Sequence, residues 1–207
     1  MEKPADFDTT VFLNCPADER YTPLLRAIVF TVLICDFTPR SALQELDGGT
    51  VRLDKIRRLI ACSRLGIHDI SRTEVDKRSG LPRFNMPFEL GLDLGARAFG
   101  AEHLTSKQVL ILDSEQYRFQ QFLSDIAGQD IAAHKGHPEL AIEKVRAWLS
   151  SLGTAGHPLP GPTHILQRYR GFQSELPETC HTVRLEPDML DLNDFINLAS
   201  NWLNANA

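Results

Sequence analysis

The chain has 207 residues, of which 43% are hydrophobic and 24% are charged, and its formal net charge is −5. These values are typical of one folded α/β domain and exclude a disordered or fibrous chain. A negative chain does not attract phosphate backbones broadly, so we do not expect nucleic acid as a partner. The longest apolar run, residues 27–35, is about half of the roughly 20 residues that cross a bilayer, so no membrane partner is expected either.

The N-terminus lacks the basic start and the apolar core of a secretory signal. None of the cysteines forms a CxxC pair; they are Cys15, Cys35, Cys62 and Cys180. Separated cysteines beside apolar runs are typical of reduced thiols, so we expect a cytoplasmic protein. His134, His137 and His157 have no acidic residue at metal-ligand spacing. We therefore expect no metal site.

Extended segments and helices alternate along the first three quarters of the chain. β-rich or apolar runs predict strands at residues 9–16, 37–44, 65–72 and 107–114, and a short segment, QDIAAH, follows at 129–134. Helical spacing of apolar residues predicts helices at residues 18–34, 51–64, 87–100, 115–128 and 138–153. Asp18 could cap the first of these helices, and a long loop from Thr73 to Pro87 indicates a functional segment.

Alternation of strands and helices predicts right-handed crossovers and a parallel sheet covered on both faces. We expect an α/β, flavodoxin-like doubly wound sheet, mainly parallel and of about five strands, in a domain of residues 1–153. Residues 154–207 begin with a Pro- and Gly-rich stretch and continue with short helical patterns near 163–175 and at 191–205. We expect them to form a C-terminal helical extension that packs on the same domain.

Polar residues follow several predicted strands. In a doubly wound sheet, ligands bind at the carboxyl ends of the strands, so these residues are candidates for a binding site. They are Asn14 and Cys15 after the first strand, Arg40 at the second, Asp69, Ser71 and Arg72 after the third, and Asp113 and Ser114 after the fourth. His68 precedes Asp69 within its strand and should point to the opposite face, as a core or helix-facing histidine does.

The stretch LPRFNMPFELGLDLG places Glu89 near the start of a helix. If Met86 is the N-cap, Pro87 lies at N1 and Glu89 at N3, where a carboxylate commonly caps a helix. A capping role alone would explain why a glutamate stands at position 89. A carboxylate at this edge of the sheet could instead stabilise or attack the C1 atom of a sugar.

Two glycines on the same helix face, Gly91 and Gly95, follow Glu89. Each costs about 1 kcal/mol relative to alanine in a helix interior. We therefore expect another group to approach this helix face closely.

The order of VFLNCP, LGIHDISR and FNMPFELGLDLGARAFG resembles the nucleoside 2-deoxyribosyltransferase and Toll/interleukin-1 receptor-like superfamily over residues 9–114. The resemblance is most specific at Asn85, Glu89, Leu90, Gly91 and Gly100. It implies that Glu89 is the catalytic glutamate and that Asp69 is the strand-end acid that contacts the base or the sugar. It also implies that the first-strand loop, with Asn14 and Cys15, lines the ribose or phosphate pocket. Asp93 stands where the family usually has a small residue.

Two functions follow from these residues. The first, which we favour, is an enzyme that cleaves the N-glycosidic bond of NAD or of a nucleoside or nucleotide. Glu89 and Asp69 would be catalytic, Asn85 would orient the substrate, and Arg40 and Arg72 would meet phosphate or ribose. No cofactor is expected, and NAD would be a substrate. The resemblance further implies self-association into a homo-oligomer and an effector role in bacterial defence.

The second function is a non-catalytic nucleotide-sensing or protein-interaction module of the same fold. The orientation of Glu89 separates the two functions. A carboxylate that faces an open cleft together with Asp69 favours the enzyme, and one folded back onto its own helix favours the module.

Overall fold

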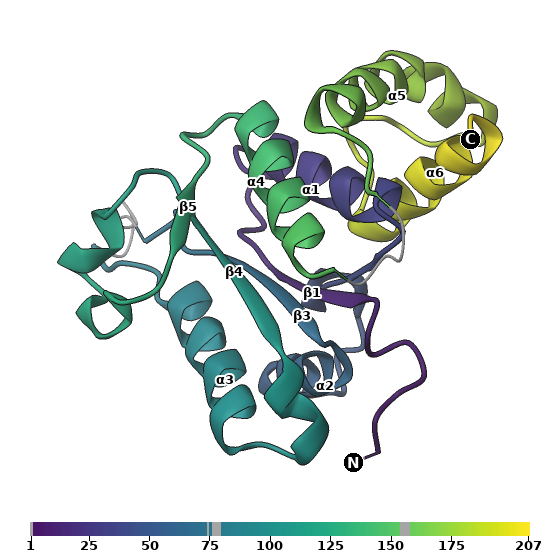
Figure 1. The fold of residues 1–207 in the computed structure, drawn as a ribbon. Helices are drawn as coiled ribbons and strands as arrows, with labels where there is room; N and C mark the ends of the chain where they lie inside the picture. Colours follow the sequence, from purple (N-terminus) through teal and green to yellow (C-terminus); the bar gives the residue numbers. More distant parts are fainter. Residues whose placement is uncertain (1, 74, 76–79, 154–157) are drawn as a thin grey trace.

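The computed structural model describes residues 2–73, 75, 80–153 and 158–207. A parallel sheet with the strand order β2-β1-β3-β4-β5 forms its centre (Figure 1). The strands are β1 (Thr10–Asn14), β2 (Thr38–Arg40), β3 (Leu65–Asp69), β4 (Gln108–Asp113) and β5 (Ile131–Ala133). This order and the parallel pairing confirm the predicted flavodoxin-like α/β fold.

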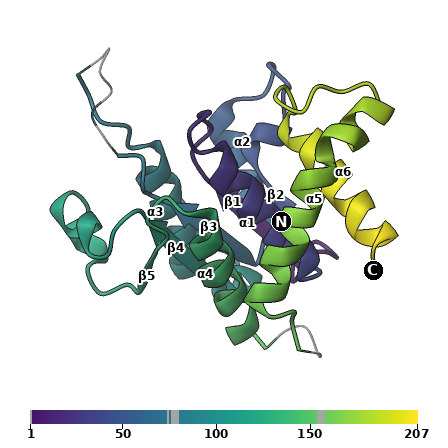
Figure 2. The same cartoon turned by 90° about the horizontal axis from the view of Figure 1, so that it is seen from above.

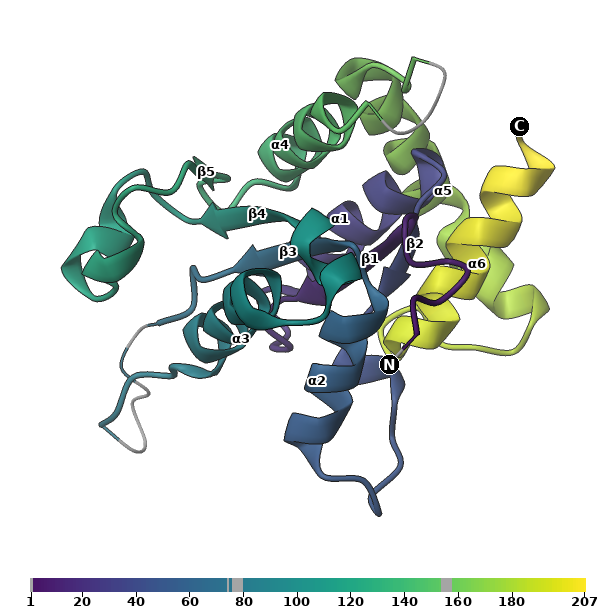
Figure 3. The same ribbon diagram turned by 60° about the horizontal axis from the view of Figure 1, so that its bottom comes forward.

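Helices cover both faces of the sheet. They are α1 (Thr22–Ile34), α2 (Arg52–Cys62), α3 (Asn85–Phe99), α4 (Pro138–Ser151), α5 (Pro162–Thr182) and α6 (Leu192–Ala205). Helices α1 and α4 lie on one face, and α2 and α3 lie on the other (Figure 3). In the part of the chain that the structure describes, none of the helices is long and apolar enough to cross a membrane.

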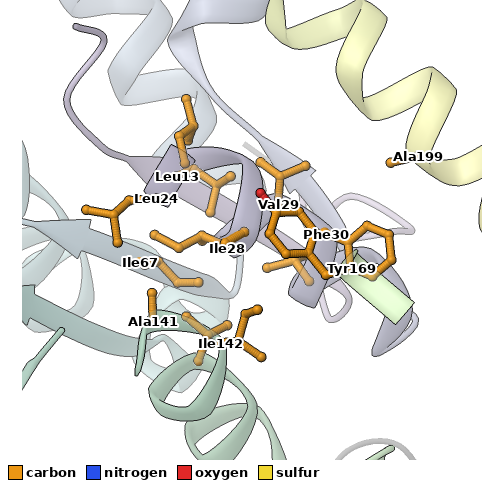
Figure 4. Close-up of a cluster of buried hydrophobic side chains, with 14 of the residues drawn as sticks. Leu13, Leu24, Ile28, Val29, Phe30, Ile67, Ala141, Ile142, Tyr169 and Ala199 are labelled. Atoms are coloured by element: carbon orange, nitrogen blue, oxygen red, sulfur yellow. The ribbon is translucent and has the colours of Figure 1, made fainter. Parts of the chain in front are cut away.

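The alternation of side chains along β1 and β3 divides the core into two layers. Leu13 and Ile67 point toward α1 and α4, where they meet Ile28 and Ile142 (Figure 4). Phe12 points the other way and packs against α2. Because successive residues of a strand face opposite sides, Asn14 and His68 lie on the α2–α3 side and Asp69 on the α1–α4 side.

The C-terminal helices add a layer outside α1 (Figure 2). Phe172 of α5 stacks on Phe30 of α1 with the ring centroids 5.5 Å apart. The same ring packs against Phe195 and Trp202 of α6. These aromatic contacts attach α5 and α6 to the main core.

Three predictions about local structure are wrong. Residues 115–128 form two short 3-10 helices, η3 (Arg118–Gln121) and η4 (Ser124–Ile126), in place of one α-helix. Tyr117 has a left-handed backbone (φ 65°), which an α-helix cannot contain, and Arg118 donates to Asp113 and to the carbonyl of Ile70. These bonds hold the segment against the carboxyl ends of β3 and β4.

Asp18 does not cap α1. The N-cap is Tyr21, and Asp18 Oδ1 accepts a hydrogen bond from the Tyr21 backbone N–H (3.2 Å) in the turn before the helix. The loop predicted between Thr73 and Pro87 is also shorter than expected, because α3 already begins at Asn85. Residues 74 and 76–79 of this loop lie outside the described residues.

Candidate functional site

A pocket opens at the carboxyl edge of the sheet, above β1 and its two neighbours. Its walls come from the loop after β1, the short 3-10 helix η1 (Ala42–Gln44) after β2, and the starts of α2 and α3. The inner cavity has a volume of about 150 Å³. It shares Ala17, Asp18, Arg72 and Arg83 with an outer cavity of about 550 Å³. This edge is the topological switch point, where ligands bind in doubly wound sheets.

Five of the ten site residues predicted from the sequence meet in this pocket. Those that line it are Asn14, Cys15, Arg72, Asn85 and Glu89. Arg40 does not, because it is exposed at the end of the edge strand β2 while Pro39 points inward. Ser71 and Asp69 are buried and also lie outside the pocket lining.

Glu89 is not a helix cap. The N-cap of α3 is Phe84, so Glu89 lies at the fifth helical position, and no side chain caps the helix. Pro87 then lies at N3, where the missing N–H removes no intrahelical bond. Glu89 is only 4% exposed, and its Oε1 lies 3.8 Å from a guanidinium nitrogen of Arg52. Burial raises the pKa of this carboxyl, and the charge of Arg52 partly opposes the shift.

A chain of buried polar groups supports the pocket from the α3 side. Asn14 Nδ2 donates to His68 Nδ1 (2.9 Å) and to the carbonyl of Met86 (2.9 Å). Because His68 Nδ1 accepts, the proton of the ring lies on Nε2, which donates to Asp93 Oδ2 (2.8 Å). Asp93 Oδ1 in turn lies 3.1 Å from Nζ of Lys107.

The Asp93–Lys107 ion pair is fully buried. Burial opposes ionisation of Asp93, but the hydrogen bond from His68 and the charge of Lys107 outweigh it and lower the pKa of this carboxyl. Burial also lowers the pKa of Lys107, and the charge of Asp93 opposes that shift. Lys107 Nζ donates further to the carbonyls of Ile60 (2.8 Å) and Ser63. A buried pair needs such additional partners to offset its desolvation.

Asp69 belongs to a separate buried network on the opposite face of the sheet. Its Oδ2 accepts from the Tyr21 hydroxyl (2.5 Å), and its Oδ1 accepts from the Ser71 backbone N–H (2.8 Å). His134 Nε2 lies 3.0 Å from Oδ2, without the alignment of a hydrogen bond. The expectation that Asp69 and Glu89 share a cleft is therefore wrong. His68 occupies the α3 face of β3, so strand alternation turns Asp69 toward α1, as predicted for this pair.

Cys15 lies between the pocket and this second network. Its side chain is buried, and burial together with the nearby charge of Asp69 raises the pKa of the thiol far above its usual range. A thiol of this kind is protonated at neutral pH and is a poor nucleophile. Cys15 therefore contributes shape to the pocket.

The glycines of α3 face a different cavity. Gly91 and Gly95 line a space of about 660 Å³ between α2 and α3. An added Cβ at either position would meet nothing within 4 Å among the described residues. The group that we expected to approach this helix face closely is therefore not found among the described residues.

Sequence reasoning missed several residues around the pocket. Arg52 and Ser41 line it, and Arg83 reaches it from the loop before α3. Arg52 is the first residue of α2. Asp93 could have been identified from the sequence, because Glu89 and Asp93 are four residues apart and therefore lie on one face of the helix.

Comparison with known proteins finds no family model, no curated protein and no solved structure that matches the chain. Among the described residues, no three His, Cys, Asp or Glu side chains are placed to hold a metal ion, and His157 lies outside them. The function must therefore be argued from the pocket itself.

Proposed function

We propose that the protein cleaves the N-glycosidic bond of NAD or of a nucleoside or nucleotide, with Glu89 as the catalytic carboxylate. The observation that carries this proposal is the position of Glu89. It is nearly buried, does not cap its own helix, and lines a pocket at the switch point of the sheet. A buried carboxylate that lines a pocket and has a perturbed pKa is typical of a functional group.

The proposed chemistry uses the carboxylate against developing positive charge. As the bond from C1′ to the base nitrogen breaks, its electron pair leaves with the base and C1′ becomes oxocarbenium-like. Glu89 would stabilise that cation or attack it, and water or a second base would then take the ribosyl group. The carboxylate of Glu89 would stabilise this cation strongly, because the side chain is shielded from water. Arg52 and Asn85 would orient the carboxylate and the sugar.

The sizes of the two cavities suit such a ligand. The inner cavity is smaller than the roughly 300–1,000 Å³ of a typical ligand pocket, so it would hold only the sugar. The outer cavity would hold the remainder, and it is lined by Arg20, Arg72 and Arg83. Asp18 and Glu19 also line it, and Arg72 pairs with Asp18 at 3.1 Å. Arginine side chains in this lining would suit a ligand with phosphate.

The alternative is a nucleotide-sensing or protein-interaction module that binds without reaction. One observation favours it. Several large apolar side chains in the loop before α3 and in the first turn of α3 are more than half exposed. They are Val75, Leu81, Phe84 and Phe88. Exposed apolar groups of this kind often mark a contact with another protein, including a second copy of the chain. Self-association and a defence role remain part of the proposal, as does a cytoplasmic location, which the four free cysteines favour.

Chromatographic analysis of products tests the proposal. Wild type, Glu89→Gln and a control, Glu143→Gln on the exposed face of α4, are incubated separately with NAD, nucleosides and nucleotides. We expect wild type and the control to release free base or nicotinamide, and Glu89→Gln to lose about 10²–10³-fold in rate. Release by Glu89→Gln at the wild-type rate would contradict the role of Glu89. Absence of release by concentrated wild type would favour the binding module.

A further inference from the structure

Arg168 of α5 is a partly buried cation without an acidic partner. Its Nε is buried, and nothing in the described part of the chain accepts a hydrogen bond from it. The two terminal nitrogens form no hydrogen bond or ion pair with the described residues either, but they are not buried and therefore reach solvent. A guanidinium that is partly desolvated attracts an anion more strongly than one in water. The terminal nitrogens are therefore available to an anionic ligand.

Aromatic packing holds this guanidinium in one place. It lies over the ring of Trp202, with Cζ 4.9 Å from the ring centroid. Trp202 itself packs against Phe30 and Phe172. Its indole N–H donates to the carboxylate of Glu175 (2.7 Å). A donor that is fixed by such contacts loses little entropy when it binds a ligand.

Arg168 lines a cavity of about 470 Å³ between the end of α1 and the helices α5 and α6. This volume falls within the roughly 300–1,000 Å³ of typical ligand pockets. The side chains of His164 and Asn204 also line it and can donate hydrogen bonds. The cavity has an apolar wall of partly exposed side chains, which are Leu33, Ile34 and Leu203. A cation and donors beside an apolar wall suit an anion that carries an apolar body.

The charge of such a ligand is limited by Asp36, which also lines the cavity. The carboxylate of Asp36 repels negative charge, so it opposes a second negative charge on the ligand. A phosphate monoester carries a charge of about −1.5 to −2 at pH 7, whereas a carboxylate carries a single charge. A carboxylate therefore fits this cavity better than a phosphate does.

We propose that this cavity binds a small organic carboxylate with an apolar body. The carboxylate accepts hydrogen bonds from the terminal nitrogens of Arg168, and the body covers the apolar wall. The site is separate from the pocket that contains Glu89. That pocket lies before the start of α1 and this cavity lies at its end, about 20 Å away along the 13-residue helix. The inference therefore does not rest on the proposed function.

Nuclear magnetic resonance tests the inference on the wild-type protein. The chain has two tryptophans, Trp148 and Trp202, and Trp148→Phe assigns their two indole N–H signals. The probes are hexanoate, acetate, which lacks the apolar body, and hexanamide, which lacks the charge. We expect hexanoate to shift the Trp202 signal to saturation and to bind at least about tenfold more tightly than either control. No saturable shift of this signal, or equal binding of hexanoate and either control, would overturn the inference.

Variants on α5 provide the second test. Arg168→Gln should lower the affinity for hexanoate about tenfold to hundredfold, because it removes the charge that the carboxylate meets. The matched control is Arg170→Gln, which removes an exposed arginine of the same helix and should bind hexanoate as wild type does. Glu89→Gln should also bind it normally. Equal losses of affinity in Arg168→Gln and Arg170→Gln would show that surface charge alone attracts the anion, and this result would contradict the inference.

Discussion

Replacement of Asp93 by alanine should strongly destabilise the protein. The change leaves the ammonium of Lys107 fully buried without its counter-ion and leaves His68 Nε2–H without an acceptor. Removal of one partner of a buried ion pair typically costs about 3–5 kcal/mol, because the remaining charge stays desolvated. The carbonyls of Ile60 and Ser63 remain as partners of Lys107, so we expect a value within that range.

Urea unfolding at pH 7, followed by circular dichroism, measures this cost. The matched control is Glu139→Ala, which removes an exposed ion pair with Arg170 (3.4 Å) and should cost less than about 1 kcal/mol. The double variant of Asp93→Ala with Lys107→Met should lose less than the sum of the single changes, by about 0.5–3 kcal/mol. An Asp93→Ala variant as stable as the control would refute the assignment of Asp93 and Lys107 as a coupled buried pair.

The same pair predicts a dependence of stability on pH. The pKa of Asp93 in the folded protein is lower than the unfolded value of 3.8. Between these two values the unfolded chain binds a proton that the folded protein does not, so stability falls as the pH decreases. The advantage of wild type over Asp93→Ala should therefore be full near neutral pH and shrink as the pH decreases below about 5. An advantage that grows on acidification would contradict the lowered pKa.

Three further changes test other parts of the structure. Glu89→Gln should stabilise the protein at neutral pH, because burial raises the pKa of Glu89 in the folded protein above its ordinary value of 4.5. Wild type loses stability as the pH rises from 4.5 to the raised pKa, whereas the variant has no carboxyl to ionise. Melting temperatures of both proteins, measured as a function of pH, check this. Gly66→Ala should cost about 1–3 kcal/mol in urea unfolding, because the new Cβ would lie 2.5 Å from Asp93 Oδ2 and 2.9 Å from His68 Nε2. Phe172→Ala should cost about 3–5 kcal/mol by the same assay, since the ring is fully buried between α1 and α6.

Each of these changes has a matched control. Glu143→Gln removes an exposed carboxyl and should leave the pH dependence of stability unchanged. Gly91→Ala lies in a helix interior with no described neighbour near the new Cβ, so it should stabilise the protein by up to about 1 kcal/mol. Phe99→Ala removes a ring that is 92% exposed and should have little effect. A cost of Gly66→Ala or Phe172→Ala no larger than that of its control would contradict the packing described for that residue.

Much of the fold could be predicted from the sequence, because it depends on local patterns. Apolar runs located β1, β3 and β4, and helical spacing located α1, α2 and α4. Parallel strands joined by crossovers end at one edge of the sheet, so strand-end residues such as Asn14 and Arg72 were correctly placed around one pocket. Where tertiary contacts decided the backbone, as at Tyr117 and Arg118, the local pattern predicted the wrong structure.

The sequence by itself determined the parallel α/β architecture, the edge of the sheet that carries the pocket, and the opposite orientations of His68 and Asp69. Only the tertiary structure decided which of these two side chains lies on the side of α3 and contacts Asn14 of the pocket. Helix α3 packs on the face of β3 that His68 occupies, and this packing brings Asp93 to His68 and excludes Asp69 from the pocket. Covalent geometry sets the alternation of side chains along a strand, whereas long-range packing sets which helix covers each face.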